Sequence, residues 1–376
     1  MTKPFVKWPG GKSEEVGIIH QYIPNNIENY IEPFLGGGAC FLSLDANEYK
    51  KAYLNDFSTE LMNLYSMIRD KNDIFYNYLL DIWTYWQSIG FFSSEVYDII
   101  KEIYDMYKIN EINDEELKGI VELFISEREN LLLKNLPKSL CKNPDRLIIE
   151  FKRSLLSKVK NIMRKEKKDG NLPENDYKSN FESGLRASVY TYYRHLYNNR
   201  NKYGLDEELH IALFFYLREF CYSSMFRYNN KGEFNVPYGG LSYNNKNFIN
   251  KIEYIRNDEL IKKLKNCQLF DLDFEDFLNK IYINKNDFMF IDPPYDGGFS
   301  DYANNSFEQD DQKRLANYLI FQCKCRFMLI IKNTDFIDNL YKNHHNINII
   351  GFDKDYRVSF MDRNDKKVKH LLITNY

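Results

Sequence analysis

The residues with the clearest chemical potential form the run Asp292-Pro293-Pro294-Tyr295, which directly follows an apolar stretch at 287–291. An apolar stretch of this length is typical of a strand that is buried on both faces. Asp292 would stand at the carboxyl end of that strand, and the two prolines would prevent further strand pairing and hold the backbone extended. Because open α/β sheets bind ligands at the carboxyl ends of their strands, we expect a ligand site here.

This run suits chemistry on the exocyclic amino group of adenine. The lone pair of that nitrogen is delocalised into the ring, which makes it a poor nucleophile. The Asp292 carboxylate and the Pro293 carbonyl could each accept one N6 hydrogen and so direct the lone pair, while Tyr295 could stack on a base that has left the duplex. The alternative interpretation is an Asp-Pro-Pro turn that only closes a strand, and the run alone does not separate the two.

Composition limits the class of protein. The chain has 376 residues, 44% hydrophobic and 28% charged, which is typical of one large or two ordinary globular domains. Its apolar stretches are too short for a membrane span, and the amino terminus lacks the hydrophobic run of a signal peptide. The six cysteines are scattered without a C-x-x-C pair, which favours free thiols in a reducing cytoplasm and no bound metal.

Charge is distributed unevenly along the chain. Residues 128–204 contain 18 Lys and Arg against 8 Asp and Glu, a net charge of +10, whereas the rest of the chain carries −13. A basic middle within an acidic chain is expected of a segment that binds nucleic acid. The alternative is a solvated helical surface without a nucleic-acid partner.

The first motif is the run Lys7-Trp8-Pro9-Gly10-Gly11-Lys12-Ser13. It ends like a phosphate-binding loop, but that loop requires glycine at position 6, where this chain has Val6. What remains is a double-glycine turn between an indole and an ammonium group. The Trp8 indole suits stacking or a cation contact, and the Lys12 ammonium suits a ligand carboxylate.

A second motif resembles the opening of a nucleotide-binding α/β domain. A strand is predicted at 29–34, followed by three glycines at 36–38 and a helix at 39–46. The next predicted strand, 51–56, ends in Asp56. A carboxylate at this position suits ribose hydroxyls, although a helix amino-terminal cap is the alternative.

The middle of the chain is predicted to be helical from residue 59 to about 222, with apolar residues at helical spacing that we expect to form a core. The following stretch, 222–240, alternates apolar and polar residues around Asn230-Lys231-Gly232, which predicts a β-hairpin suited to a DNA groove. Further strands are predicted at 267–270, 327–332, 347–352 and 369–374, with a helix beginning after a cap at Asn305 or Ser306.

Several motifs together resemble the Dam-like, D12 class of S-adenosylmethionine-dependent DNA adenine-N6 methyltransferases. In chain order they are Lys7–Lys12, Glu32–Gly38, Asn55–Asp56, Arg227–Asn229, Gly232–Pro237, Asp273–Phe274, Asp292–Tyr295, Ser306–Phe307 and Asn333–Asp335. The resemblance covers about 1–58 and 211–376. It implies a Rossmann-like α/β methyltransferase sheet with a largely helical target-recognition insertion that carries a β-hairpin.

The resemblance also implies roles for individual residues, with S-adenosyl-L-methionine as the cofactor. The catalytic residues would be Asp292, Pro293, Pro294 and Tyr295. The cofactor-binding residues would be Trp8, Lys12, Phe34, Gly36, Gly38, Asp56, Asp273, Phe274 and Asp292. The DNA-binding residues would be Tyr222, Ser223, Met225, Arg227, Asn229, Lys231 and Pro237.

The expected catalytic domain comprises 1–58 and 262–376, and the expected recognition insertion comprises 59–261. The insertion is longer than in compact family members, and Tyr222–Met225 reads Tyr-Ser-Ser-Met where GATC enzymes carry Tyr-Asn-Gly-Leu, so GATC specificity is not carried over. The expected function is N6 methylation of adenine in double-stranded DNA, either as the modification enzyme that is partnered by a restriction endonuclease or as an orphan or phage methylase. Methylation of RNA and DNA binding without catalysis are the alternatives.

Overall fold

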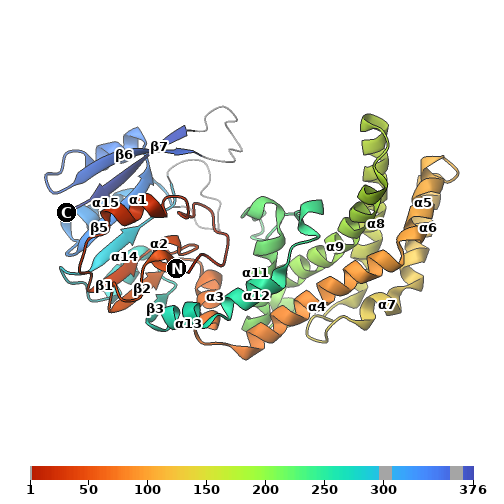
Figure 1. Cartoon of the computed structure of the whole chain (residues 1–376), viewed down its shortest axis with the longest axis horizontal. Helices are drawn as coiled ribbons and strands as arrows, with labels where there is room; N and C mark the ends of the chain where they lie inside the picture. Colours follow the sequence, from red (N-terminus) through yellow and green to blue (C-terminus); the bar gives the residue numbers. More distant parts are fainter. Residues whose placement is uncertain (1, 296–306, 356–366) are drawn as a thin grey trace. The chain divides into compact units, whose positions relative to one another are not determined.

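The computed structural model describes residues 2–295, 307–355 and 367–376 (Figure 1). Its chain divides into two compact units. The sheet unit comprises Met1–Lys71, Phe226–Tyr228 and Ile255–Tyr376, and the helical unit comprises Asn72–Met225 and Asn229–Tyr254. The sheet unit extends to Lys71 and resumes at Ile255, whereas the expected boundaries were 58 and 262. Helix α3 (Thr59–Arg69) packs against α13 (Asp258–Lys265) and strand β3 (Cys267–Phe270) within the sheet unit.

The sheet unit is built on seven strands in the order β3-β2-β1-β4-β5-β7-β6. They are β1 (Asn29–Glu32), β2 (Lys51–Asn55), β3 (Cys267–Phe270), β4 (Phe288–Ile291), β5 (Arg326–Lys332), β6 (Asn348–Asp355) and β7 (Lys367–Thr374). The first five pair in parallel, whereas β7 runs antiparallel to both β5 and β6. This sheet confirms the predicted α/β class and the predicted strands. The strand order reverses between β1 and β4, which is where ligands bind in open α/β sheets.

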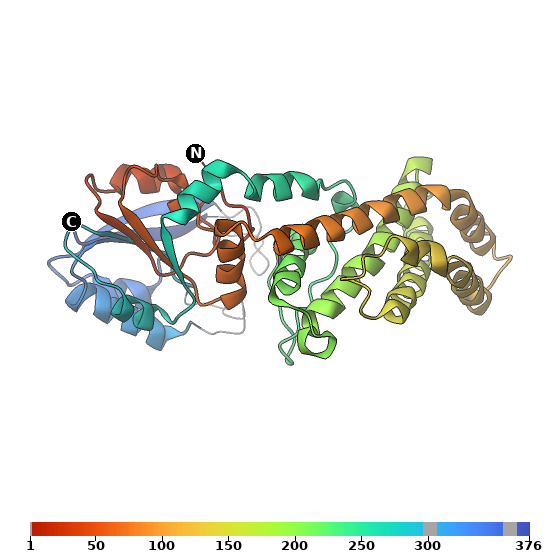
Figure 2. The ribbon, with the colours of Figure 1, turned by 90° about the horizontal axis from the view of Figure 1, so that it is seen from below.

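Helices cover both faces of the sheet. They are α1 (Val16–Tyr22), α2 (Ala39–Ser43), α3, α13, α14 (Phe274–Lys280), α15 (Gln309–Phe321) and α16 (Asp335–Tyr341). One face, with Ile31, Met289 and Phe327, packs against α14, α15 and α16 in a single buried cluster. The other face, which includes Tyr30, packs against Phe41 of α2, with ring centroids 6.0 Å apart. Figure 2 shows the red α1 and the light-blue carboxyl-terminal helices on opposite sides of the sheet.

Two local predictions for this unit have different outcomes. The cysteines are free thiols, as expected, and Cys323 and Cys325 lie in the join between α15 and β5, with their sulfur atoms 3.7 Å apart. Helix α15 begins after Glu308, which forms a capping box with Asp311. The predicted cap at Asn305 or Ser306 lies outside the described residues.

The helical unit confirms the predicted helical middle of the chain. Its helices are α4 (Asp73–Glu95), α5 (Tyr97–Lys108), α6 (Asp114–Glu127), α7 (Glu129–Lys134), α8 (Pro144–Asp169), α9 (Glu174–Asn198), α10 (Arg200–Tyr203), α11 (Glu207–Phe220) and most of α12 (Phe248–Ile255). The predicted apolar stripes are buried. In the part of the chain that is described, no helix has the length and apolar character needed to cross a membrane.

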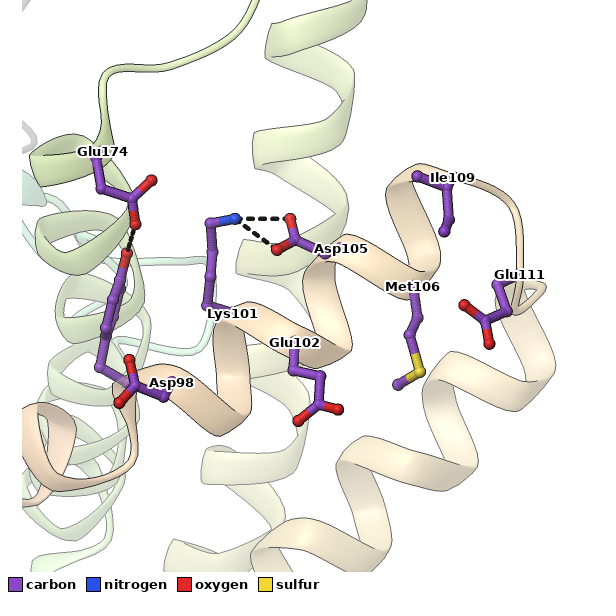
Figure 3. Close-up of a pocket in the computed structure, with 9 residues that line it drawn as sticks. Asp98, Lys101, Glu102, Asp105, Met106, Ile109, Glu111 and Glu174 are labelled. Atoms are coloured by element: carbon purple, nitrogen blue, oxygen red, sulfur yellow. Dashed lines mark hydrogen bonds and ion pairs between the residues drawn. The ribbon is translucent and has the colours of Figure 1, made fainter.

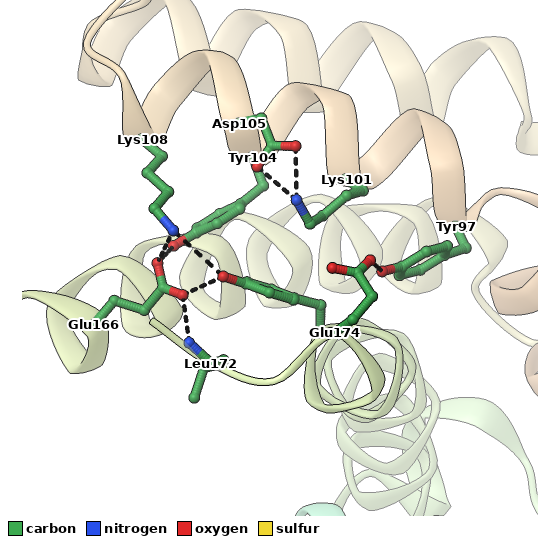
Figure 4. A network of polar contacts seen from close by, with 9 residues as sticks. Tyr97, Lys101, Tyr104, Asp105, Lys108, Glu166, Leu172 and Glu174 are labelled. Atoms are coloured by element: carbon green, nitrogen blue, oxygen red, sulfur yellow. Dashed lines mark hydrogen bonds and ion pairs between the residues drawn. The ribbon is translucent and has the colours of Figure 1, made fainter. Parts of the chain in front are cut away.

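Polar groups also fix this unit, around the buried carboxylate of Glu166 on α8 (Figure 4). Glu166 accepts hydrogen bonds from the hydroxyls of Tyr104 and Tyr177 and from the Leu172 amide, and its carboxylate lies 2.8 Å from Lys108 Nζ. Burial raises the pKa of Glu166, but these contacts outweigh burial and lower the pKa to about 2. The ionised carboxylate therefore ties α5 to the connection between α8 and α9.

Candidate active site

The centre of the site is Asp292, at the carboxyl end of β4. The Lys12 Nζ atom lies 2.5 Å from Asp292 Oδ1 and 2.6 Å from Oδ2, and it also donates to the Tyr295 hydroxyl at 2.8 Å and the Gly10 carbonyl at 2.8 Å. The Lys12 side chain is 2% exposed and that of Asp292 is 17% exposed. The double-glycine turn near the amino terminus therefore directs its ammonium group at the Asp-Pro-Pro-Tyr run, 280 residues further along the chain.

Pro293, Pro294 and Tyr295 extend from the same strand end. Pro293 is buried and Pro294 is exposed. The Pro294 carbonyl accepts a hydrogen bond from Gln312 Nε2 on α15 at 2.7 Å. The Tyr295 ring is half-buried and lies edge-on to His370 of β7, with ring centroids 5.4 Å apart. The loop is thus held at its first, third and fourth residues. The glycine turn that follows it in sequence lies outside the described residues.

The glycine loop after β1 lies close against the Trp8 indole. Gly36 has a φ of +50°, and a Cβ atom there would lie 2.8 Å from Trp8 Cδ1. Gly38 has a φ of +67°, and a Cβ atom there would lie 2.6 Å from the Tyr65 hydroxyl. Both positions therefore require glycine for two reasons, the left-handed backbone and the close approach. The Trp8 ring also contacts Phe226 edge-on, with centroids 4.6 Å apart.

Asp56 follows β2 and is fixed by the backbone beside the glycine loop. Its carboxylate accepts hydrogen bonds from the Gly36 amide at 2.8 Å and the Ser58 amide at 3.0 Å. Burial raises the pKa of Asp56 to about 6, although both backbone bonds favour the ionised form. The neighbouring Asn55 bonds to the backbone of Pro33 and Leu272, which ties the ends of three strands together.

An aromatic cluster lies beside this edge of the sheet. Phe34 packs against Phe274 and Phe307, with centroids 5.6 and 5.5 Å away. Asp273 caps α14 and accepts a hydrogen bond from Arg314 at 2.7 Å, while the Arg314 guanidinium lies 4.8 Å from the centroid of the Phe274 ring. Asp273 and Phe274, two of the predicted cofactor-binding residues, are therefore both in contact with Arg314. Ser306, which precedes Phe307 in the family motif, lies outside the described residues.

Glu32 was not predicted as a site residue, yet it lies at the end of β1, next to β4. It is 2% exposed, and its Oε2 atom accepts a hydrogen bond from the Tyr30 hydroxyl at 2.8 Å. Burial raises the pKa of Glu32 well above its ordinary value, and the charge of Asp292 raises it further. Both effects favour the neutral form of the Glu32 carboxyl. The feature of the sequence that could have identified Glu32 is its position at the end of a strand.

The predicted hairpin at 222–240 is irregular and forms no continuous two-stranded ladder. Cys221 and Tyr238 form an isolated antiparallel bridge, Tyr228 and Phe234 are further isolated bridge residues, and Tyr222–Ser224 form a 3₁₀ turn. Ser223 and Ser224 both have left-handed backbones, with φ of 51° and 53°. Left-handed residues break the alternation that strand pairing requires, so the segment is a loop.

The two arms of this loop are held by the helices of the helical unit. The buried Arg218 of α11 donates to the carbonyls of Ser224 and Met225 at 3.2 and 3.1 Å. Asn198 of α9 bonds to both the amide and the carbonyl of Phe234. The tip is closed by Asn229, whose side-chain oxygen accepts from the amides of Lys231 and Glu233.

The predicted DNA-binding residues differ in exposure. Four of them besides Lys231 are exposed: Tyr222, Ser223, Arg227 and Pro237. Met225 is half-buried, and the Asn229 amide is used within the turn. Two acids that precede and follow Arg227 in the chain have partners of their own: Glu219 pairs with Lys246, and Glu233 accepts a hydrogen bond from the Asn229 amide. The exposed side chains remain suited to contact with a ligand, whereas Asn229 has a structural role.

A surface pocket of about 400 Å³ lies in the helical unit along α5 (Figure 3). Its lining residues are Tyr97, Asp98, Lys101, Glu102, Asp105, Met106, Ile109, Glu111 and Glu174. The only cation among these residues, Lys101, pairs with Asp105 at 2.7 Å. A pocket with five carboxylates disfavours phosphate, so it is not a nucleic-acid site. Within the described ranges, no group of three or more His, Cys, Asp or Glu could hold a metal ion.

The strand order, the antiparallel β7 and the glycine loop after β1 define a Rossmann-like methyltransferase. The family model for "D12 class N6 adenine-specific DNA methyltransferase" matches residues 8–355, and the chain belongs to this family. It is therefore an adenine-specific DNA methyltransferase.

Individual relatives extend over the whole chain. The Type II methyltransferase M.CviBI of Paramecium bursaria Chlorella virus NC1A is 26% identical over 100% of both chains. The Type II methyltransferase M.MjaIII of Methanocaldococcus jannaschii is 27% identical over 100% of this chain and 99% of its own. The retron Ec67 DNA adenine methylase of Escherichia coli is 33% identical over 40% of this chain and 53% of its own. The long insertion is therefore not peculiar to this chain, since the matches to two relatives extend over the whole of this chain.

Proposed function

We propose that this enzyme transfers a methyl group from S-adenosyl-L-methionine to the N6 atom of an adenine flipped out of a specific double-stranded DNA site. The observation that carries the proposal is the contact of Lys12 with Asp292 and Tyr295 at the end of β4, where the strand order reverses. At this strand end, the Asp292 carboxylate, the Pro293 carbonyl in its proline-stiffened loop and the Tyr295 ring follow one another at the position where the fold binds its ligands.

The chain's own groups have separable roles in the reaction. The Asp292 carboxylate and the Pro293 carbonyl accept the two N6 hydrogens, and the Tyr295 ring stacks on the base. Lys12 pairs with both carboxylate oxygens of Asp292 and orients the carboxylate. Asp292 need not be a strong base, because N6 loses its proton readily once it carries the methyl group and a positive charge. Asp292 Oδ can then accept that proton.

The residues around the glycine loop fit the cofactor, which supplies an electrophilic methyl group when bound. Gly36 and Gly38 let the backbone approach a ligand beside the Trp8 indole, and a Cβ atom would fill that space. Asp56 offers its carboxylate to the ribose hydroxyls, and Asp273 with Phe274 offers an acceptor and a ring to the adenine of the cofactor. Phe34 completes the aromatic wall.

We assign recognition of DNA to the loop at 222–240 and to exposed lysines near the end of α8. The loop presents Tyr222 and Arg227 to solvent, and Arg218 holds its backbone at Ser224 and Met225. On α8, Lys165, Lys167 and Lys168 are exposed and suited to phosphate contacts. The helical unit, together with Phe226–Tyr228 of the loop, thus acts as the target-recognition insertion, and the rest of the sheet unit acts as the catalytic domain.

The biological setting follows from the names of the relatives. Two full-length relatives are Type II methyltransferases, which supports modification of a site that a cognate restriction endonuclease also recognises. The reaction would take place on DNA in the cytoplasm.

The test compares substrates directly. The purified chain is incubated with S-adenosyl-L-methionine carrying a labelled methyl group and with duplex DNA, single-stranded DNA or RNA of the same random composition. We expect N6-methyladenine in duplex DNA, and sequencing of modified bases in DNA from cells that express the chain should locate one short site. Label that enters RNA alone would contradict the proposal.

A further inference from the structure

Gln312 touches the catalytic loop without belonging to any motif of the sequence. It is the fourth residue of α15, it is 0% exposed, and its Nε2 atom donates to the Pro294 carbonyl at 2.7 Å. Gln312 is not among the residues to which a contact with cofactor or DNA is assigned above. Its contact with the loop that carries Asp292 is therefore a structural connection that the proposed mechanism has not used.

The position of Gln312 is fixed by the helix that carries it. The amino-terminal turn of α15 is closed by the capping box of Glu308 and Asp311, and its inner face buries Leu315 and Leu319 against the sheet. Arg314 anchors the same turn to Asp273. Gln312 therefore presents its amide to the loop from a rigid support.

The bond to Pro294 constrains the carbonyl that precedes it. The peptide plane with the Pro293 carbonyl is joined to the Pro294 carbonyl through φ and ψ of Pro294. The proline ring fixes φ, so a hydrogen bond that holds the Pro294 carbonyl restricts how this peptide plane can turn. Asp292 is held from the other side by Lys12. The Pro293 carbonyl, which is proposed to accept an N6 hydrogen, therefore lies between two anchored residues.

Burial of the Gln312 side-chain amide costs free energy of folding unless its polar atoms form hydrogen bonds. Among the described residues, Gln312 Oε1 has no hydrogen-bond partner and is buried. An unsatisfied buried acceptor destabilises the fold, whereas an apolar side chain of the same size would not. What the amide supplies in return is its hydrogen bond to the Pro294 carbonyl.

We propose that Gln312 is a positioning residue, which orients the Pro293 carbonyl toward the adenine amino group by holding the Pro294 carbonyl. This inference rests on the proposed function of the Asp292 loop. Small displacements of positioned groups have large effects on rate, so removal of this hydrogen bond should slow methyl transfer while binding of cofactor and DNA is unchanged.

The test uses two substitutions that separate the hydrogen bond from packing. Gln312→Met keeps the length of the side chain and removes the donor. Gln312→Glu keeps the shape but donates only when the carboxyl is protonated, and burial favours that form as the pH falls. The matched controls are Gln322→Met and Gln322→Glu, the same changes at an exposed residue just after the other end of α15.

The measurement is the single-turnover rate of methyl transfer to duplex DNA at saturating cofactor, from pH 6 to pH 8. We expect Gln312→Met to slow transfer roughly tenfold to hundredfold at every pH. Gln312→Glu should recover toward the wild-type rate as the pH is lowered. Dissociation constants of cofactor and DNA should change less than about twofold, and both Gln322 variants should match the wild type.

Two results would overturn the positioning role. One is a Gln312→Met variant with the wild-type rate, and the other is a Gln312→Glu variant as slow as Gln312→Met at every pH. Thermal unfolding followed by circular dichroism verifies that each variant is folded. Asp292→Ala in the same assay separates the two hypotheses. Transfer within about tenfold of the wild-type rate would refute the proposed site, whereas an inactive Asp292→Ala variant beside unaffected Gln312 variants would refute only the positioning role.

Discussion

Lys12 Nζ lies between the two carboxylate oxygens of Asp292, 2.5 Å from one and 2.6 Å from the other. A nearly buried ammonium that also donates to Tyr295 and to the Gly10 carbonyl has more acceptors than hydrogens. The amino-terminal turn is thus part of the catalytic loop in space. We infer from this arrangement that Lys12 orients Asp292, besides making the cofactor contact expected from the sequence.

Replacing Lys12 by Met should therefore lower the rate of methyl transfer even at saturating cofactor, roughly tenfold to hundredfold, because Asp292 loses the partner that orients it. Trp8→Ala is the comparison. It should weaken cofactor binding by about 0.5–2 kcal/mol, because the indole face is removed. Calorimetry and single-turnover rates measure the two effects. A Lys12→Met variant that changes only cofactor affinity would assign Lys12 to the cofactor alone.

The raised pKa of Asp56, about 6, predicts a pH dependence of cofactor binding. Ribose hydroxyls are donors, so they favour the ionised carboxylate, which predominates above pH 6 and is lost below it. Affinity should then fall by up to about tenfold per pH unit below 6. Asp56→Asn should bind more weakly at pH 8 and lose this component of the pH dependence. Identical pH profiles for wild type and variant would remove Asp56 from the cofactor site.

The exposed lysines of α8 should contribute DNA affinity without sequence preference. Replacing Lys165, Lys167 and Lys168 by Gln removes up to three positive charges that neutralise phosphates. The slope of log affinity against log salt should fall by about 0.9 for each phosphate that is no longer neutralised. The control replaces three exposed lysines of the sheet unit: Lys280, Lys324 and Lys342. Equal slopes for wild type and the α8 variant would mean that this helix end is only a solvated surface.

Arg227 is expected to read a base. It is exposed and belongs to the segment that resembles the DNA-reading part of the family, and arginine can donate to guanine O6 and N7 together. Arg227→Ala should cost roughly 1–3 kcal/mol at one guanine and relax the preference there. Lys231→Ala should instead weaken all sites alike. Methylation of a library with each base varied in turn measures both, and an unchanged ranking of sites in Arg227→Ala would contradict base reading.

The strands and the ligand edge could be predicted because short apolar runs bounded by glycine, proline or aspartate specify them locally. Asp292 and Asp56 were predictable for the same reason: each directly follows such a run. The irregular loop at 222–240 was not predictable, because Ser223 and Ser224 have left-handed backbones and Arg218, a buried residue of α11, holds the carbonyls of Ser224 and Met225. An alternating pattern alone indicates a hairpin and does not reveal this contact.

Gln312 and Arg314 were missed for a related reason. Their partners, Pro294 and Asp273, lie 18 and 41 residues earlier in the chain, and the contacts depend on how α15 is rotated against the sheet. A helical pattern predicts which residues are buried, but it does not predict which loop a buried amide will meet.

The most direct test of the central claim is the single-turnover transfer of labelled methyl groups to duplex DNA by Asp292→Ala. Asp310→Ala serves as the control, since Asp310 is an exposed acid of the neighbouring α15. We expect Asp292→Ala to be inactive while it remains folded and binds DNA with the affinity of the wild type, and we expect Asp310→Ala to form N6-methyladenine at the wild-type rate. Transfer by Asp292→Ala within about tenfold of the wild-type rate, a difference of only about 1.4 kcal/mol, would contradict the account.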